Sequence, residues 1–121
     1  MYTVLIIEDD PVIRSTLDKI LTAEGYTVSF AINAEDGFNA CLRNKPDLIL
    51  LDVNLPDGDG IDLCRKIKAE QKIRHIPILI LTGEAVDVER RMEGLEGGAD
   101  DYILKPFSAK ELVLRVKRSI G

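Results

Sequence analysis

Short apolar runs in this chain end at residues that can do chemistry. These residues are Glu8, Asp9 and Asp10 after the first run, and Asp52, Thr82 and Lys105 after three later runs. Carboxylates brought together from two strand ends repel one another, raise a pKa, or bind a hard cation through their oxygens. Mg²⁺ is the cation we expect, because it binds through one or two carboxylates, waters and a substrate phosphate.

A cation, a hydroxyl and an ammonium around a carboxylate are the components of an in-line phosphoryl transfer. The cation and Lys105 would neutralise the oxygens of the transferring group, Thr82 would hold one of them, and Asp52 would attack. Each residue alone has a simpler explanation, since an Asp after a strand is often a turn former or a helix cap. Their occurrence together at four strand ends favours a reacting site over these simpler explanations.

Alternating apolar and amphipathic stretches predict the elements that position these residues. We expect strands at Val4–Ile7, Tyr26–Phe30, Leu48–Leu51, Ile78–Leu81 and Tyr102–Leu104. The first, third and fourth are apolar throughout, which is typical of parallel strands covered on both faces, while the second alternates like a strand nearer an edge. The pattern predicts an α/β fold with a single doubly wound, five-stranded parallel sheet. Ligands bind beyond the carboxyl ends of such strands, at a switch point.

Five helices are expected, with apolar residues at helical spacing on one face of each. The expected faces are Val12, Ile13, Leu17, Ile20 and Leu21; then Phe38 and Leu42; then Ile61, Cys64 and Ile67; then Val88, Met92 and Leu95; and last Leu112, Val113 and Val116. Asp10 and Pro11 open the first helix, Gly25 closes it, and Asn33 can cap the second. Ser108 with Glu111 is a capping box for the fifth.

Size and composition restrict the class of protein. The 121 residues fit one domain, residues 1–121, and a formal net charge of −5 offers no basic surface to nucleic acid or an anionic membrane. Cys41 and Cys64 lack the spacing of a zinc or redox motif, so we expect buried free thiols. We find no pattern of a signal peptide or a membrane span, and therefore expect a cytoplasmic location.

Motifs along the whole chain resemble the response-regulator receiver domain of two-component signalling. They are Ile6 to Asp10, Asp47 to Asp52, Leu55 to Gly58, Pro77 to Thr82, Gly98 to Tyr102, and Lys105 to Phe107. The resemblance implies a flavodoxin-like (βα)5 fold. It also implies that Asp52 accepts a phosphoryl group from the phosphohistidine of a sensor histidine kinase or a histidine phosphotransfer protein.

The resemblance assigns roles around Asp52. Mg²⁺, with Mn²⁺ as an alternative, would be held by Asp9, Asp52 and the backbone carbonyl of Asn54, and Glu8 would act through the waters of the ion. Thr82 and Lys105 would bind the phosphoryl oxygens, and the Lys105–Pro106 peptide bond would be cis. The chain would catalyse only its own phosphorylation and dephosphorylation.

Two further pairs concern the response to phosphorylation. Thr82 would move toward the phosphoryl group and leave space for Tyr102, which makes these two the expected switch residues. Asn54 and Glu84, two residues beyond Asp52 and Thr82, would tune hydrolysis. They are residue types associated with rapid self-dephosphorylation in chemotaxis-type receivers.

The segment 90–102 is similar to receivers attached to winged-helix DNA-binding domains. That similarity implies a dimer face at Arg91, Leu95, Glu96, Asp101, Glu111, Val113, Arg115 and Lys117. The expected ion pairs across it are Arg91 with Glu111, Asp101 with Arg115, and Glu96 with Lys117. Phosphorylation would promote dimerisation or partner binding there, with no direct contact of this segment to nucleic acid or a membrane.

Alternatives from other classes remain. A degenerate receiver would act as a phosphorylation-independent binding module. An aspartyl-nucleophile phosphatase would need a second carboxylate where Asn54 stands, and a flavodoxin-like cofactor carrier would need a phosphate loop after the first strand. The chain ends at Gly121, directly after the last expected helix. It therefore fits a stand-alone receiver, a receiver cut from a transcription factor, or a receiver from a hybrid kinase. The initiating Met1 disfavours the hybrid kinase.

Overall fold

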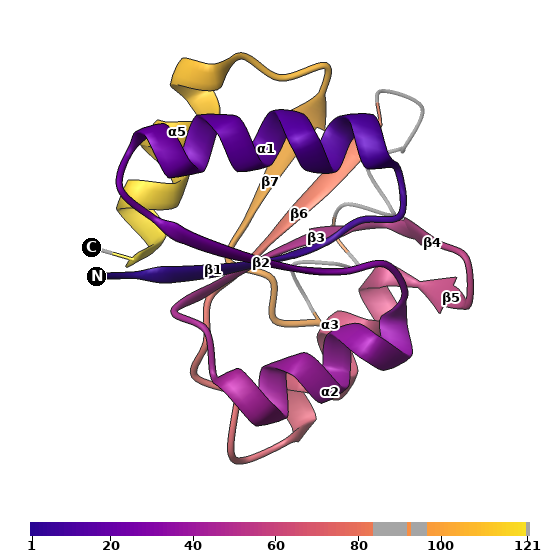
Figure 1. Ribbon diagram of the computed structural model, residues 1–121. Helices are drawn as coiled ribbons and strands as arrows, with labels where there is room; N and C mark the ends of the chain where they lie inside the picture. The colour runs from indigo at the N-terminus through magenta and orange to yellow at the C-terminus, as the bar shows by residue number, and fades with distance from the viewer. Residues whose placement is uncertain (84–91, 93–96, 121) are drawn as a thin grey trace.

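Five parallel strands form one sheet in the computed structural model, which describes residues 1–83, 92 and 97–120. Their order across the sheet is β2-β1-β3-β6-β7 (Figure 1). The strands are β1 (Thr3–Ile7), β2 (Thr27–Ala31), β3 (Leu48–Asp52), β6 (Ile78–Gly83) and β7 (Asp101–Lys105). Each overlaps a predicted run, and β2 lies at an edge, so the predicted parallel sheet is confirmed.

Helices cover both faces of this sheet, as a doubly wound fold requires. One face carries α1 (Pro11–Ala23) and α5 (Ala109–Ile120), and the other carries α2 (Ala34–Asn44) and α3 (Gly60–Ala69) (Figure 1). The predicted fourth helix falls mostly outside the described residues, so the number of five helices is not confirmed. Met92, its one described residue, is exposed.

Side-chain caps start the helices where the sequence predicts. The Asp10 carboxylate accepts hydrogen bonds from the N–H groups of Val12 and Ile13, and Asn33 accepts one from Asp36. These bonds satisfy N–H groups that have no partner within the helix. In α5 the Ser108 hydroxyl oxygen accepts a hydrogen bond from the N–H of Glu111 at 3.0 Å.

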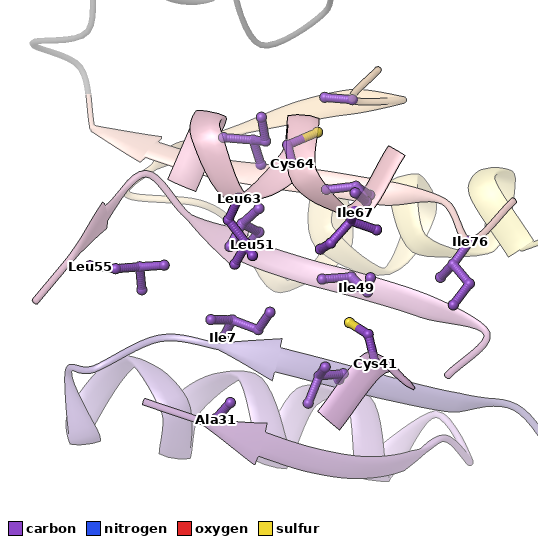
Figure 2. Packing of buried hydrophobic residues seen from close by; sticks show 14 of the residues in the cluster. Ile7, Ala31, Cys41, Ile49, Leu51, Leu55, Leu63, Cys64, Ile67 and Ile76 are labelled. Atoms are coloured by element: carbon purple, nitrogen blue, oxygen red, sulfur yellow. The ribbon is translucent and has the colours of Figure 1, made fainter. Parts of the chain in front are cut away.

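Alternate residues of each central strand enter two separate cores. Ile7, Ile49 and Leu51 pack beneath α2 and α3 (Figure 2), whereas Ile6 and Leu50 pack beneath α1 and α5. This division follows from the period of two along a strand. Because both cores are apolar, the strand ends are where buried polar groups emerge.

Both cysteines are buried free thiols, as predicted (Figure 2). Burial raises the pKa of Cys41 to about 12 and that of Cys64 to about 11, so neither is a reactive thiolate at neutral pH.

The expected place of Val12 on the apolar face of the first helix is wrong. Its side chain is 72% exposed, because Val12 lies on the same helical stripe as exposed Thr16 and Lys19, whereas Leu17 and Leu21 face the sheet.

A short antiparallel hairpin after β3 has no strand-like pattern in the sequence. It pairs β4 (Asn54–Leu55) with β5 (Gly58–Asp59), and these two-residue strands are too short to show a period. The hairpin carries the chain from Asp52 into α3. None of the helices in the described part of the chain combines the length and apolar character needed to cross a bilayer.

Candidate phosphoryl-acceptor site

The carboxyl ends of β1 and β3 lie side by side in the middle of the sheet. Ile7 pairs with Leu51 in the parallel register, so Glu8 and Asp52 leave the strands next to each other. Successive connections from β1 run to β2 on one side and later to β3 on the other, which makes this edge a topological switch point. Both carboxylic residues are buried, Glu8 at 1% and Asp52 at 5% exposure.

Lys105 reaches this edge from the last strand. Its Nζ atom lies 3.1 Å from Asp52 Oδ1 and 3.3 Å from Glu8 Oε2. A buried carboxylate is costly unless it is paired, and this ammonium pairs with two of them. The Lys105–Pro106 peptide bond is cis, as the resemblance implies.

Glu8, Asp9 and Asp52 form a group of oxygen donors that fits a hard cation. One carboxylate oxygen from each lies within 4.8 Å of the others. Glu8 also accepts a hydrogen bond at Oε1 from the N–H of Asp10, at 3.2 Å. Three convergent carboxylates, of which Asp9 is exposed to solvent, suit a Mg²⁺ ion that keeps several waters. Asn54, predicted to add its carbonyl, begins β4 two residues after Asp52.

The charges of the site shift two pKa values. Burial, followed by the charge of Asp52, raises the pKa of Glu8 to about 7, although Lys105 acts to lower it. Burial alone lowers the pKa of Lys105, but Asp52 and Glu8 outweigh it, and that pKa is raised. In the metal-free chain the Glu8 carboxyl therefore loses its proton near neutral pH. A bound cation would require the charged carboxylate.

The two expected switch residues lie on neighbouring strands. Thr82 is buried near the end of β6, and its hydroxyl donates to the carbonyl of Gly83 at 3.4 Å. Tyr102 pairs with Ile80, two residues before Thr82, so the side chains of Thr82 and Tyr102 are on the same face of the sheet. Tyr102 is half-buried against the core beneath α2 and α3.

Part of the predicted dimer face is described, and it makes its ion pairs within one chain. Arg115 Nη1 lies 2.7 Å from Asp101 Oδ1 and 2.6 Å from Oδ2, and Arg115 Nε lies 3.2 Å from Glu111 Oε1. The bond to Asp101 is the main cause of a raised Arg115 pKa. Pairing of Asp101 with Arg115 between two chains stays a prediction.

Of the other members of the predicted dimer face, two lie in the described part of the chain and three do not. Val113 is half-buried on α5, and Lys117 is exposed. Arg91, Leu95 and Glu96 lie outside the described residues, as does the rate-tuning candidate Glu84.

Three features around the site are not evident from sequence patterns. Arg14 binds backbone carbonyls of the acidic turn, and the Asp57 carboxylate accepts hydrogen bonds from the N–H groups of Ala34 and Glu35. A Cβ atom on Gly60 would meet the carbonyl oxygen of Asp52 at 2.2 Å. No sequence pattern marks the contacts of Arg14 and Asp57. The one weak signal for Gly60 is that it directly follows Asp59, whose carboxylate caps α3 by accepting a hydrogen bond from the N–H of Ile61 at 2.8 Å.

The chain belongs to the response regulator receiver domain family, whose match covers residues 4–117. It is 41% identical over 117 residues to the transcriptional regulatory protein AfsQ1 of Streptomyces coelicolor, covering 97% of this chain and 50% of the relative. It is 43% identical over 115 residues to the phosphate regulon transcriptional regulatory protein PhoB of Pseudomonas aeruginosa, covering 95% and 50%. The chain thus spans about half the length of these curated relatives.

Solved structures agree with this membership. A response regulator described as putative, from Chloroflexus aurantiacus, is 37% identical with a TM-score of 0.93, covering 98% of this chain and 97% of that one. The receiver domain of the sensor histidine kinase PA1611 from Pseudomonas aeruginosa is 33% identical with a TM-score of 0.90, covering 99% and 98%. That structure holds a magnesium ion coordinated in its active site cleft.

A receiver domain of response regulators is a phosphorylation-dependent signalling switch in two-component regulation, and this function applies to the chain. The phosphatase, the cofactor carrier and the phosphorylation-independent binding module are not favoured.

Proposed function

We propose that Asp52 is the phosphoryl acceptor of this receiver. The observation that carries the proposal is the 3.1 Å ion pair from Lys105 Nζ to Asp52 Oδ1 beside the carboxylates of Glu8 and Asp9. In the reaction an Asp52 carboxylate oxygen forms a bond to phosphorus while the bond from phosphorus to a histidine nitrogen breaks. The electron pair of that bond returns to the imidazole, which takes up a proton.

The residues around Asp52 serve this step in different ways. Asp9, Asp52 and the carbonyl of Asn54 would hold Mg²⁺, or Mn²⁺ in its place, and Glu8 would act through the waters of the ion. When bound, that ion supplies positive charge to the oxygens of the transferring group. Support comes from the three carboxylates within 4.8 Å of one another.

Thr82 and Lys105 hold the phosphoryl oxygens after transfer. The Thr82 hydroxyl bonds only to the adjacent carbonyl of Gly83 at 3.4 Å among the contacts described, which is long for such a bond and leaves the hydroxyl free to turn. Its movement toward a phosphoryl group opens space on the face that it shares with Tyr102. Tyr102 then turns inward, which biases the domain toward its active conformation.

Residues 1–121 act as a single receiver that catalyses only its own phosphorylation and dephosphorylation. The donor is a sensor histidine kinase or a histidine phosphotransfer protein in the cytoplasm. The output is protein–protein contact, and this segment itself does not bind nucleic acid.

Incubation with acetyl phosphate and Mg²⁺, followed by intact mass measurement, tests the proposal. We expect one phosphoryl adduct that disappears in Asp52→Asn and on addition of a chelator. Adduct formation in Asp52→Asn would contradict the assignment of the acceptor. Turnover of an external phosphoester would indicate a phosphatase, and the lack of any adduct would leave a binding module.

The described part of the proposed output surface consists of β7 and α5, and its other members, Arg91, Leu95 and Glu96, lie outside the described residues. Two ion pairs are already present there, from Arg115 to Asp101 and to Glu111. A second chain could replace either partner at little cost in free energy, because surface ion pairs contribute little to stability. Sedimentation with and without beryllofluoride, a phosphoryl mimic, measures dimerisation. We expect a dimer only with the mimic and its loss in Arg115→Ala, whereas Arg118→Ala in the last turn of α5 serves as the matched control.

A further inference from the structure

We infer that Arg14 is a positioning residue for the acidic turn after β1, an inference that rests on the Mg²⁺ site proposed above. The Nη1 atom of Arg14 donates a hydrogen bond to the carbonyl oxygen of Glu8 at 3.1 Å and another to that of Asp9 at 3.0 Å. Arg14 lies in the first turn of α1 and is half-buried. One guanidinium nitrogen thus holds the backbone of two residues whose carboxylates belong to the site.

These two carbonyls lie on either side of the Cα atom of Asp9. The Glu8 carbonyl belongs to the peptide plane before that atom, and the Asp9 carbonyl belongs to the plane after it. Because peptide groups are planar, φ and ψ of Asp9 are the only soft torsions between the two planes. A donor that holds both carbonyls therefore restrains both torsions, and with them the direction in which the Asp9 carboxylate leaves the backbone.

The neighbours of Asp9 have restraints of their own. The Glu8 N–H donates to the carbonyl of Ala31 at 3.0 Å, and the Glu8 carboxylate binds the N–H of Asp10 and the Lys105 ammonium. Asp10 caps α1. Asp9 lies between these anchored residues with its side chain exposed. The peptide after Asp9 is held at its N–H by Glu8 and at its carbonyl by Arg14, and the carbonyl of the peptide before Asp9 is held by Arg14, so the two Arg14 bonds add to the Glu8 bond in ordering the middle of the turn.

A positioning role and a purely electrostatic role for Arg14 predict changes of opposite sign. Loss of a positive charge near a cation site relieves repulsion, so electrostatics alone would tighten Mg²⁺ binding in Arg14→Gln. Loss of the two carbonyl bonds lets Asp9 sample other directions and weakens Mg²⁺ binding. Residues that orient metal ligands typically contribute about tenfold or more to affinity.

The test is a calorimetric titration of the metal-free chain with Mg²⁺. We expect about tenfold weaker binding in Arg14→Gln, and an intermediate value in Arg14→Lys, which keeps a charged donor on a shorter stem. Asp47→Ala is the matched control, because Asp47 binds the N–H of Thr3 at 2.8 Å at the opposite edge of the sheet. This variant loses a comparable side chain–backbone bond and should keep wild-type Mg²⁺ affinity, even where its thermal midpoint falls.

A second measurement needs no metal. Amide ¹⁵N relaxation in the metal-free protein should show larger motion at Asp9 and Asp10 in Arg14→Gln than in wild type and Asp47→Ala. Unchanged or tighter Mg²⁺ binding in Arg14→Gln would overturn the inference, as would unchanged motion at Asp9. If wild type itself fails to bind Mg²⁺, the proposed metal site is wrong, and the relaxation data alone decide whether Arg14 orders the turn.

Discussion

Lys105 Nζ lies 3.1 Å from Asp52 Oδ1, although the two residues are 53 positions apart in the chain. The Lys105 ammonium therefore lies next to the proposed nucleophile before any phosphoryl group arrives. The same ammonium also pairs with Glu8. A cation at this edge would meet the same two carboxylates, so Lys105 would compete with it for them in the resting state. The two would cooperate only when the phosphoryl oxygens are present.

Replacing Lys105 should therefore have two opposite effects. In Lys105→Met we expect tighter Mg²⁺ binding, because a competing cation is gone. We also expect phosphorylation by acetyl phosphate to slow by on the order of a hundredfold, because the transferring oxygens lose a preorganised charge. Titration calorimetry and intact mass against time measure the two effects. Lys110→Met, on the exposed side of α5, is the control. Weaker Mg²⁺ binding in Lys105→Met would contradict this account.

The raised pKa of Glu8 predicts how the stability of the metal-free protein depends on pH. Its pKa is about 7 in the folded chain and near 4.5 ordinarily, so the folded state binds the proton more tightly than the unfolded state does. Stability should fall as the pH rises from about 4.5 to about 7, by on the order of 3 kcal/mol.

Urea unfolding followed by circular dichroism in a chelator, at pH 5 and pH 8, checks this prediction. Glu8→Gln keeps the shape of the side chain without its titration, so its difference in unfolding free energy between the two pH values should be smaller by the same amount. Parallel pH profiles for the two proteins would show that Glu8 does not carry the effect.

Gly60 is expected to accept no side chain, because a Cβ atom there would lie 2.2 Å from the Asp52 carbonyl oxygen and 2.9 Å from the Cα atom of Val53. Both are backbone atoms, so Gly60→Ala must displace the loop that carries the acceptor. We expect a loss of about 1–3 kcal/mol in unfolding free energy together with slower phosphorylation.

Gly58→Ala supplies a control in the same hairpin. A Cβ atom at Gly58 has no heavy atom of the described residues within 4 Å, so its unfolding free energy should be close to that of wild type. Equal stability of the Gly58 and Gly60 variants would contradict the predicted clash.

Hydrolysis of the phosphorylated state should depend on Asn54 and Glu84. Asn54 is exposed at the start of the hairpin, two residues after Asp52, where its side chain would admit water to the acyl phosphate. In the double variant Asn54→Met with Glu84→Lys we expect a lifetime about tenfold longer, which corresponds to about 1.4 kcal/mol in the barrier to hydrolysis. Decay of the adduct after removal of acetyl phosphate measures the lifetime, and an unchanged rate would remove both residues from this role.

Much of the fold follows from local sequence patterns, because burial on one or two faces imposes a period that single residues reveal. The apolar runs identify all five strands of the parallel sheet, and Asp10, Asn33 and Ser108 mark helix starts whose caps the structure confirms. Val12 does not lie on the apolar face of α1 as predicted. An apolar residue in the first turn of a helix fits either of two stripes along it, and only contact with the sheet selects one.

The sequence by itself determined the chemical composition of the site: carboxylates, a hydroxyl and an ammonium at the carboxyl ends of parallel strands, which must share one edge. The tertiary structure alone decided which of these groups touch. Strand order set β1 beside β3, and the length of the Lys105 side chain let it reach both Asp52 and Glu8 from β7. The supports from Arg14, Asp57 and Gly60 likewise arise from packing between elements, which leaves no periodic trace in the chain.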